Sequence, residues 1–419
     1  MNSKQRKTPG VYVTEPSAFP RPVTGVATAL PAFIGYTEKA PDAGQVAAGL
    51  AAEIESMEQY RALFGGGWSG DSAGAAPILY ESLELFFGNG GTRCLIASVG
   101  SFADFAGDLV KEIGLRPERM WEGLAAIEAQ PGPTLLLAPD ALAMADDDYF
   151  PFACAMVQQA AQLGDRFAIL DVPGGGDPAN RTPALIDAVM ARFHAGISPV
   201  GDGRSFGGAY FPWLKTVIGG VRRVLPAAPA IAGIYAANDE GRGVWTAPAG
   251  MSVAMIEGPT IPVDADEQAG MNLPVDGLAV NAIRDFPGRG TLVWGARTLD
   301  GNSDDYRYIH ARRTLIYLDQ SIRTGLRQFA FAPNDATTWA AVTAMLSAFL
   351  TDLWQAGGLF GATASGAFTI SCGIGSTMSG QDVLAGMLRL RIAVALIHPA
   401  EFITLDFAQQ TAIRPQPAL

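Results

Sequence analysis

The chain has 419 residues, of which 49% are hydrophobic and only 17% are charged, and its formal net charge is −12. This length predicts two or three domains, or one domain with a large insertion, and the composition excludes a disordered chain. So little charge indicates a protein that buries an unusual fraction of itself or covers surface by assembling with its own copies. The acidic balance gives no global attraction to nucleic acid.

Cysteine usage and the N-terminus bear on where the protein folds. Cys94, Cys154 and Cys372 are odd in number and far apart, so no disulfide framework is predicted. Buried reduced thiols are expected, and they fit folding in the cytoplasm. Residues 1–7 are basic but lead into no apolar h-region, so no Sec signal is predicted. No apolar run reaches the roughly 18 residues of a membrane span.

The first predicted element is a lone strand. Pro9 and Pro16 bracket a β-prone stretch with alternating side chains. Its members are Val11, Tyr12, Val13 and Thr14. No tight turn connects this stretch to a following strand, so it needs a pairing partner from elsewhere.

The middle of the chain alternates between helix and strand patterns, the rhythm of a parallel α/β sheet. Strands are predicted at 93–99, 134–138, 166–172 and 207–211, and helices at 77–87, 147–163 and 183–193. Three stretches interrupt this rhythm: a surface connection with one helix at 41–75, a small insertion at 101–130, and a Gly/Pro-rich connection at 241–290.

The last third is more sharply patterned. Apolar residues recur at helical spacing in 304–325 and 336–356, with Asn334 or Asp335 as the N-cap of the second helix. Strands are predicted at 367–372 and 388–396, separated by a capping box at Ser379 and Asp382. A final alternating strand contains Phe402, Ile403, Leu405 and Phe407.

Catalytic and ligand motifs are weak throughout. His194, His310 and His398 lack a second ligand at metal spacing, so a structural role is expected for each. Asp171 and the glycines at 174–176 stand at a strand end, where α/β sheets hold ligands. However, no Walker A, GxGxxG or G-x-S-x-G pattern accompanies them. We therefore expect no cofactor and no metal.

A cluster of arginines on and beside the helix at 304–325 is the remaining candidate site. It includes Arg307, Arg312, Arg313 and Arg323. Such a cluster is usually a solvated helix face. In an acidic protein it is alternatively a docking patch for an acidic partner.

Several segments resemble the tail sheath family of contractile phages and extracellular contractile injection systems. They occur in the family's order along nearly the whole chain. They are 8–13 (Thr-Pro-Gly-Val-Tyr-Val), 29–37 (Ala-Leu-Pro-Ala-Phe-Ile-Gly-Tyr-Thr), 165–171, 241–250, 281–290 (Asn-Ala-Ile-Arg-Asp-Phe-Pro-Gly-Arg-Gly), 293–298, 312–313, 331–335 with Trp339, and 399–403.

The resemblance implies a structural subunit and no enzyme. Subunits of the family stack as sixfold rings around an inner tube, exchange terminal strands with neighbours, and contract to drive the tube through a target envelope. The implied partners are copies of itself, the inner tube, baseplate and cap proteins, and possibly sister sheath proteins, without nucleic acid or membrane insertion. Such particles assemble in the bacterial cytoplasm and are released by lysis. The exchanged strands would be 11–14 and 402–407, and the arginines would be the inner-tube contact.

The implied fold is a parallel-type α/β core on a subtilisin-like scaffold plus an α+β C-terminal domain completed by the N-terminal segment. The expected division is 1–40 as an arm and strand packing with the C-terminal domain, 41–240 as the α/β domain, 241–290 as a connection, and 291–419 as the sheath domain. Two other functions stay open at this point. They are an α/β hydrolase or nucleotide-binding enzyme, and a non-contractile capsid or surface-layer subunit.

Overall fold

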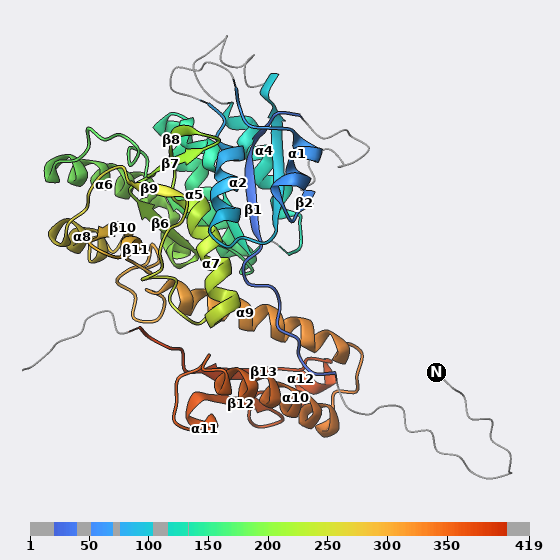
Figure 1. Cartoon of the computed structure of the whole chain (residues 1–419). Coiled ribbons are helices and arrows are strands. Elements are labelled where there is room, and N and C mark those ends of the chain that lie inside the picture. The colour runs from blue at the N-terminus through green and yellow to red at the C-terminus, as the bar shows by residue number, and fades with distance from the viewer. Residues whose placement is uncertain (1–20, 40–51, 70–75, 104–115, 133, 400–419) are drawn as a thin grey trace, which may run out of the picture.

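The computed structural model describes residues 21–39, 52–69, 76–103, 116–132 and 134–399. An eight-stranded sheet in the order β11-β10-β6-β5-β4-β1-β3-β2 forms its centre (Figure 1). Neighbours from β10 to β3 pair parallel, and the edge strands β11 and β2 pair antiparallel. The strands are β1 (Pro31–Thr37), β2 (Ala52–Ile54), β3 (Cys94–Ser101), β4 (Leu135–Leu137), β5 (Phe167–Asp171), β6 (Gly207–Phe211), β10 (Val280–Phe286) and β11 (Gly290–Val293).

Helices cover both faces of this sheet and make two cores. On one face lie α4 (Pro117–Glu128), α5 (Asp146–Leu163), α6 (Pro183–Ile197) and the short α8 (Ala265–Asn272). On the other face lie α1 (Met57–Phe64), α2 (Leu79–Gly88) and α7 (Ala228–Arg242). Short 3₁₀ turns η1 (Pro139–Ala143) and η2 (Ser198–Phe206) precede α5 and β6. The strands are buried on both sides, as expected of a parallel sheet.

The predicted strands and helices of the middle region are all present, which confirms the α/β alternation. The structure differs from the expected placement at three stretches. Residues 31–37 form the fully buried β1 at the centre of the large sheet, because their apolar side chains face both helix layers. The stretch 241–290, expected as a connection, contributes β10 to the same sheet. The region 101–130 also holds α4, whose Leu124 and Ile127 are buried against the sheet. The domain boundaries themselves stay predictions.

A small three-stranded sheet in the order β8-β7-β9 lies beside the second helix layer. Its strands are β7 (Leu214–Ile218), β8 (Val221–Leu225) and β9 (Ile256–Pro259). The β7–β8 turn is Gly219-Gly220, with φ of 58° and 79°. Two successive left-handed residues are what a two-residue hairpin turn requires, and glycine adopts them without strain.

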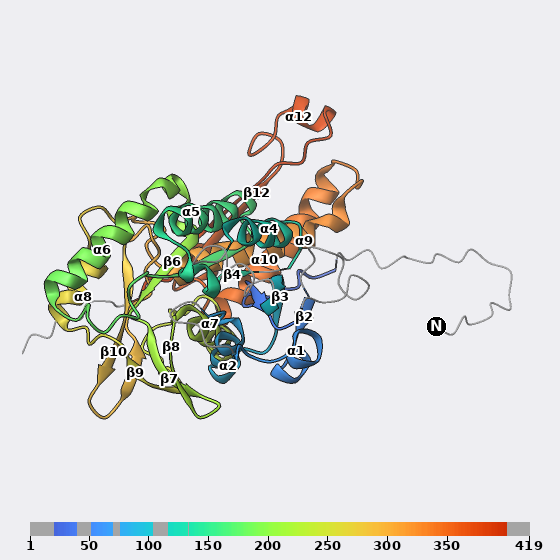
Figure 2. The same cartoon turned by 90° about the horizontal axis from the view of Figure 1, so that it is seen from above.

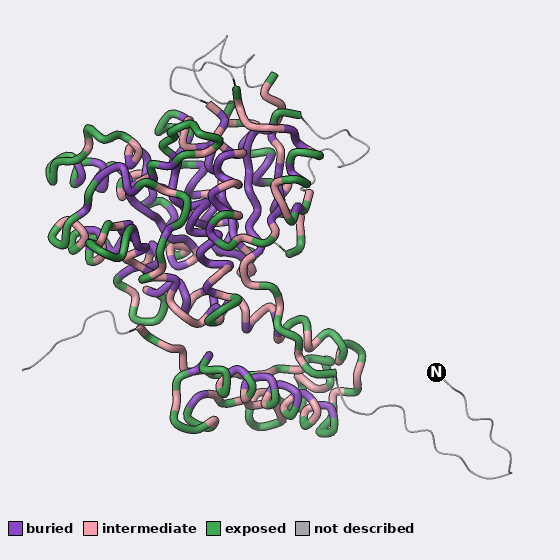
Figure 3. The backbone as a smooth tube through the Cα atoms, viewed as in Figure 1, coloured by how far each residue is buried: buried purple, intermediate pink, exposed green. Residues whose placement is uncertain are grey.

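The C-terminal unit is smaller and less buried. It contains α10 (Ala336–Gln355), α11 (Ala364–Ala367), α12 (Gly380–Leu384) and a two-stranded sheet of β12 (Phe368–Cys372) and β13 (Leu390–Val394). Asp335 caps α10, and Ser379 with Asp382 forms the predicted capping box. Figure 3 shows buried backbone concentrated in the large sheet, while β12 and β13 contain no fully buried residue.

Helix α9 (Ile309–Leu326) joins the two units. Its 18 residues span about 27 Å. Ile309 and Ile316 pack in the core of the large sheet, and Leu318 and the half-buried Ile322 pack against α10 in the C-terminal core. A 3₁₀ turn, η3 (Arg327–Phe329), follows it.

Residues 21–28 run antiparallel along α9 from its end toward its beginning. Arg21 and Gln328 exchange two hydrogen bonds of 2.8 and 3.0 Å. Further along, Val26 N donates to Ser321 Oγ at 3.1 Å. Val23 packs into the C-terminal core. The N-terminal segment therefore completes the packing of the C-terminal unit before it enters β1.

Arg313 ties α9, α7 and the N-terminal segment together. Its guanidinium makes two hydrogen bonds to the Asp239 carboxylate, at 2.6 and 3.0 Å, and a third to Thr28 O at 2.8 Å. It also stacks 4.5 Å from the centre of the Tyr235 ring. Both partners of the ion pair are nearly buried, with side chains 3% and 5% exposed. Breaking one side of such a pair strands the other charge in the interior.

We predict that Arg313→Met lowers the free energy of unfolding by about 3–5 kcal/mol, because it leaves the Asp239 carboxylate buried without a partner. The double variant Arg313→Met, Asp239→Leu should recover most of this loss, since both charges are then gone. Urea denaturation of both variants is the measurement. Equal stability of the single and double variants would contradict the account.

Candidate assembly surfaces

The carboxyl ends of the parallel strands are where an α/β sheet holds a ligand. Asp140 follows β4 at this edge, and its carboxylate accepts from Tyr36 N and from Ile78 N, each at 2.7 Å. Ile78 is the residue at which α2 begins. The Asp140 carboxylate thus joins the end of β1 to the start of α2.

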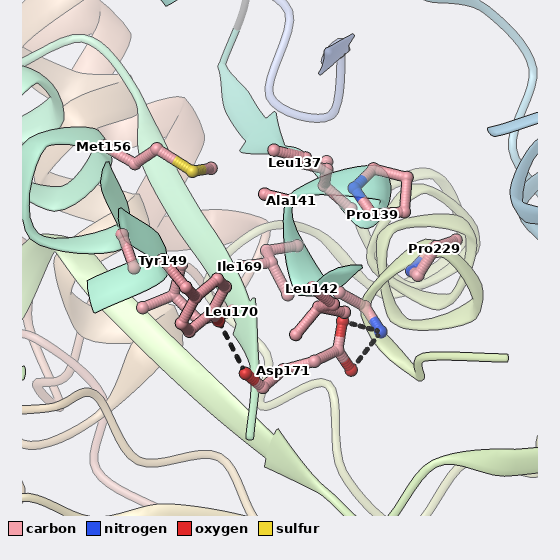
Figure 4. Close-up of a pocket in the computed structure, with 13 residues that line it drawn as sticks. Leu137, Pro139, Ala141, Leu142, Tyr149, Met156, Ile169, Leu170, Asp171 and Pro229 are labelled. Atoms are coloured by element: carbon pink, nitrogen blue, oxygen red, sulfur yellow. Dashed lines mark hydrogen bonds between the residues drawn. The ribbon is translucent and has the colours of Figure 1, made fainter. Parts of the chain in front are cut away.

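Asp171, at the end of β5, plays the same part for α7 (Figure 4). Its carboxylate accepts from Ala227 N at 2.6 Å and Ala228 N at 3.0 Å, and its backbone carbonyl accepts from the Tyr149 hydroxyl at 2.8 Å. The adjoining pocket is only about 20 Å³ in volume, which is room for one water molecule. Burial raises the pKa of Asp140 and of Asp171 to about 7. The backbone N–H donors act in the opposite direction, because they stabilise the charged carboxylate and so lower the pKa of each group.

The glycine loop at 174–176 is filled by the chain itself. A Cβ on Gly176 would lie 2.5 Å from the Trp213 ring, and the Trp213 indole N–H donates to Val172 O at 3.0 Å. The glycines therefore admit an indole where a nucleotide loop would admit a phosphate. Both acids hold the start of a helix. A pocket of about 360 Å³ opens beside Asp140 and is lined by Glu81 and Trp213.

The histidines have structural contacts. His194 Nδ1 lies 2.9 Å from Asp276 Oδ2. His310 is 1% exposed, its Nε2 donates to Ile397 O at 3.1 Å, and burial lowers its pKa to about 4. The Tyr308 ring stacks on His310 and meets His398 edge-on. Within the described ranges no cluster of three or more metal-ligating side chains occurs, and no helix there is long and apolar enough to cross a membrane.

The four candidate arginines have different environments. Arg313 is buried in its ion pair with Asp239, so it cannot meet a partner in this conformation. Arg312 is half-buried, stacks on the Phe206 and Tyr306 rings and donates to Ser205 Oγ at 2.6 Å. Arg307 contacts its neighbour Asp304. Arg323 alone of the four is largely exposed, at 71%, and pairs one turn away with Asp319 at 2.7 Å.

A cleft of about 890 Å³ lies where the described chain ends at its C-terminal side. Trp245, Trp294, Tyr308 and His310 line it from the large unit. Ile397 and Pro399 line it from the outgoing chain. The C-terminal segment therefore leaves the body near the start of α9, whereas the N-terminal segment leaves near its end, at Gln328.

The sheet of β12 and β13 has only two strands among the described residues. Each strand has the other as its one neighbour among the described residues, so both outer edges are open. A two-stranded sheet is only marginally stable without further strands or a covering element. The predicted terminal strands, Val11, Tyr12, Val13 and Thr14 at one end and Phe402, Ile403, Leu405 and Phe407 at the other, lie outside the described residues.

Comparison with known proteins explains these features. Residues 302–410 match the family described as the phage tail sheath C-terminal domain. The tail sheath protein of Vibrio phage KVP40 is 25% identical over 138 residues, 33% of this chain, and the match spans a fifth of the length of that protein.

Two solved structures cover almost the whole chain. The PVC sheath complex of an extracellular contractile injection system, in its contracted state, is 28% identical, with a TM-score of 0.73 over 97% of this chain and 99% of that one. A chain of the anti-feeding prophage baseplate is 29% identical, with a TM-score of 0.69 over 97% and 100%. Residues 302–410 thus carry the C-terminal domain of the phage tail sheath family, and the whole chain is similar to sheath proteins of extracellular contractile injection systems.

Proposed function

We propose that this chain polymerises with its own copies into stacked sixfold rings around an inner tube, and that the sheath contracts to drive the tube through a target envelope. The observation that carries this proposal is the likeness, over 97% of the chain, to the contracted sheath of an extracellular contractile injection system. The full-length likeness to a baseplate chain supports contact with a baseplate. Cap proteins and sister sheath proteins complete the proposed partners, and assembly takes place in the bacterial cytoplasm.

The open edges of β12 and β13 support strand exchange between subunits. Each edge exposes unpaired N–H and C=O groups that a strand from another copy can satisfy. The described chain starts near one end of α9 and stops near the other. Strands donated by residues 11–14 and 402–407 would therefore meet two different neighbours. In a lattice, many weak strand contacts act at once, so the assembled sheath is stable although each single contact is weak.

Contraction then alters the packing between subunits while each core stays rigid. The large sheet has two dense cores, whereas the C-terminal unit has open strand edges. A bistable set of contacts between subunits stores the energy, so firing needs no nucleotide. We retain the subtilisin-like scaffold as part of this proposal, without protease chemistry.

Deleting residues 1–16 should leave a soluble, cooperatively folded chain that no longer polymerises, because the packing of residues 21–28 along α9 is untouched. The double substitution Tyr12→Pro, Val13→Pro should act alike, since it removes strand N–H donors but keeps the arm. Asn2→Pro, Ser3→Pro is the matched control and should assemble normally. Normal tubes from either test variant in electron micrographs would refute strand exchange by this segment.

Arg323 is the best remaining candidate for contact with the inner tube. Arg323→Glu should fold normally, because exposed ion pairs contribute about 0–1 kcal/mol. It should bind tubes more weakly than the native chain at low salt and show less salt dependence. Arg389→Glu is the matched control, since Arg389 also pairs with a carboxylate on the C-terminal unit. Co-sedimentation with tubes across a salt series is the measurement, and identical curves would remove Arg323 from the interface.

The structural role of Asp171, a buried carboxyl group that holds the start of α7, predicts a stability that depends on pH. Its pKa in the folded chain, about 7, lies above its ordinary value, so its contribution to stability is full below pH 4 and falls as pH rises through 7. The stability difference between the native chain and Asp171→Asn should therefore shrink with rising pH, by at most about 1.4 kcal/mol per pH unit. The exposed Asp187→Asn is the control. Parallel stability profiles from pH 4 to 8 would contradict this role.

A further inference from the structure

The β7–β8 hairpin presents an outward face of mixed apolar and basic character. The strands pair Lys215 with Val224 and Val217 with Arg222, so these four side chains share one face. The alternate residues Leu214, Thr216 and Leu225 point inward and are buried. We call Lys215, Val217, Arg222 and Val224 the hairpin face.

This face has the composition of an interface. Val217 of β7 and Val224 of β8 are 42% and 43% exposed. Beside them stand two cations, in a chain whose net charge is −12. Arg222 pairs with Glu257 at 3.2 Å, but both side chains are exposed, at 82% and 40%, so that pair holds Arg222 only weakly. An apolar centre with cations around it fits an acidic protein surface that carries an apolar group.

A surface of that kind lies on the other side of the same chain. Helices α4 and α5 cover the opposite face of the large sheet from the hairpin (Figure 2). Their solvent side carries exposed acids and Trp121, which is 41% exposed with its ring 5.5 Å from Phe152 of α5. The acidic face, as we define it, consists of Glu118, Trp121, Glu122, Asp147 and Asp148.

We infer that the hairpin face of one copy docks on the acidic face of the next copy, with Trp121 against the valines and the carboxylates around Lys215 and Arg222. The inference rests on the proposed sheath, which supplies the neighbouring copy. Because the two faces lie on opposite sides of the sheet, the contact is head-to-tail. Each copy can then bind two neighbours through it, and such a contact builds rings or helices.

The test uses the full-length chain and measures its critical concentration for polymerisation by sedimentation, with micrographs of the pellets. Lys215→Glu, Arg222→Glu should raise the critical concentration about tenfold at low salt, with a smaller effect at high salt. The matched control is Arg242→Glu, Arg289→Glu, which makes the same charge change at exposed positions outside the four residues of the hairpin face. It should leave the critical concentration unchanged.

Charge exchange identifies the partner surface. Glu118→Lys, Glu122→Lys alone should impair assembly, and combining it with the hairpin variant should restore assembly to within about threefold of the native chain. Circular dichroism melts verify folding. If the hairpin variant misfolds, Arg222→Gln and Trp121→Ala are tested instead, and each should weaken assembly.

Three results would overturn the inference: normal assembly of the folded hairpin variant, equal loss in the control, or failure of the combined variant to recover. In each of these cases the native chain still polymerises, so the sheath function stands. Failure of the native chain to polymerise on a tube would instead overturn the proposed function.

Discussion

Helix α9 packs in the core of the large sheet and in the C-terminal core at the same time. The ion pair of Arg313 with Asp239 fixes the position of the helix between them. Apolar packing alone would let a helix slide or rotate on a smooth surface. The paired hydrogen bonds at 2.6 and 3.0 Å, with a third to Thr28 O, set one position of α9 relative to α7 and the N-terminal segment. The described chain starts at Arg21, beside the end of α9, and stops at Pro399, near its beginning. The positions of these two points relative to the large sheet therefore depend on this buried pair.

The large sheet is much more deeply buried than the C-terminal unit. This difference fits a subunit whose C-terminal unit becomes buried in contacts with other copies. The large sheet is buried on both faces and needs nothing further. In the part of the chain that the structure describes, β12 and β13 have no strand neighbour besides each other, and neither contains a fully buried residue. Free energy left unsatisfied in a monomer is available to an assembly. A contractile sheath requires connections between subunits that survive large movements of rigid bodies, and the strand exchange proposed above would provide such connections.

The sequence predicted the periodic elements well and the long-range contacts poorly. Helices α9 and α10 and strands β3 to β6 follow from local patterns, because one face or both faces are apolar. Helix α7 was missed because it is Ala-rich and buried almost all round, so it carries no amphipathic stripe. The hairpin was missed although Gly219-Gly220 between β-prone residues is its signal. Arg313 looked like a surface charge, because its partner Asp239 is 74 residues away and no local pattern connects them.

In enzymes of this architecture the catalytic residues lie at the carboxyl ends of the strands. In this chain the acidic residues at that edge hold neighbouring elements of the fold in place. Asp140 and Asp171 lie at the carboxyl ends of β4 and β5, and both carboxylates are engaged by backbone N–H groups. Asp140 accepts from β1 and from the start of α2, and Asp171 accepts from the start of α7. An acid that caps a buried helix has few lone pairs left for a substrate, and moving it would unpair the helix terminus. Trp213 fills the glycine loop beside them. The chemistry-bearing positions of the fold thus rigidify the body, and the open positions, the strand edges and the exposed hairpin, lie where other copies can reach them.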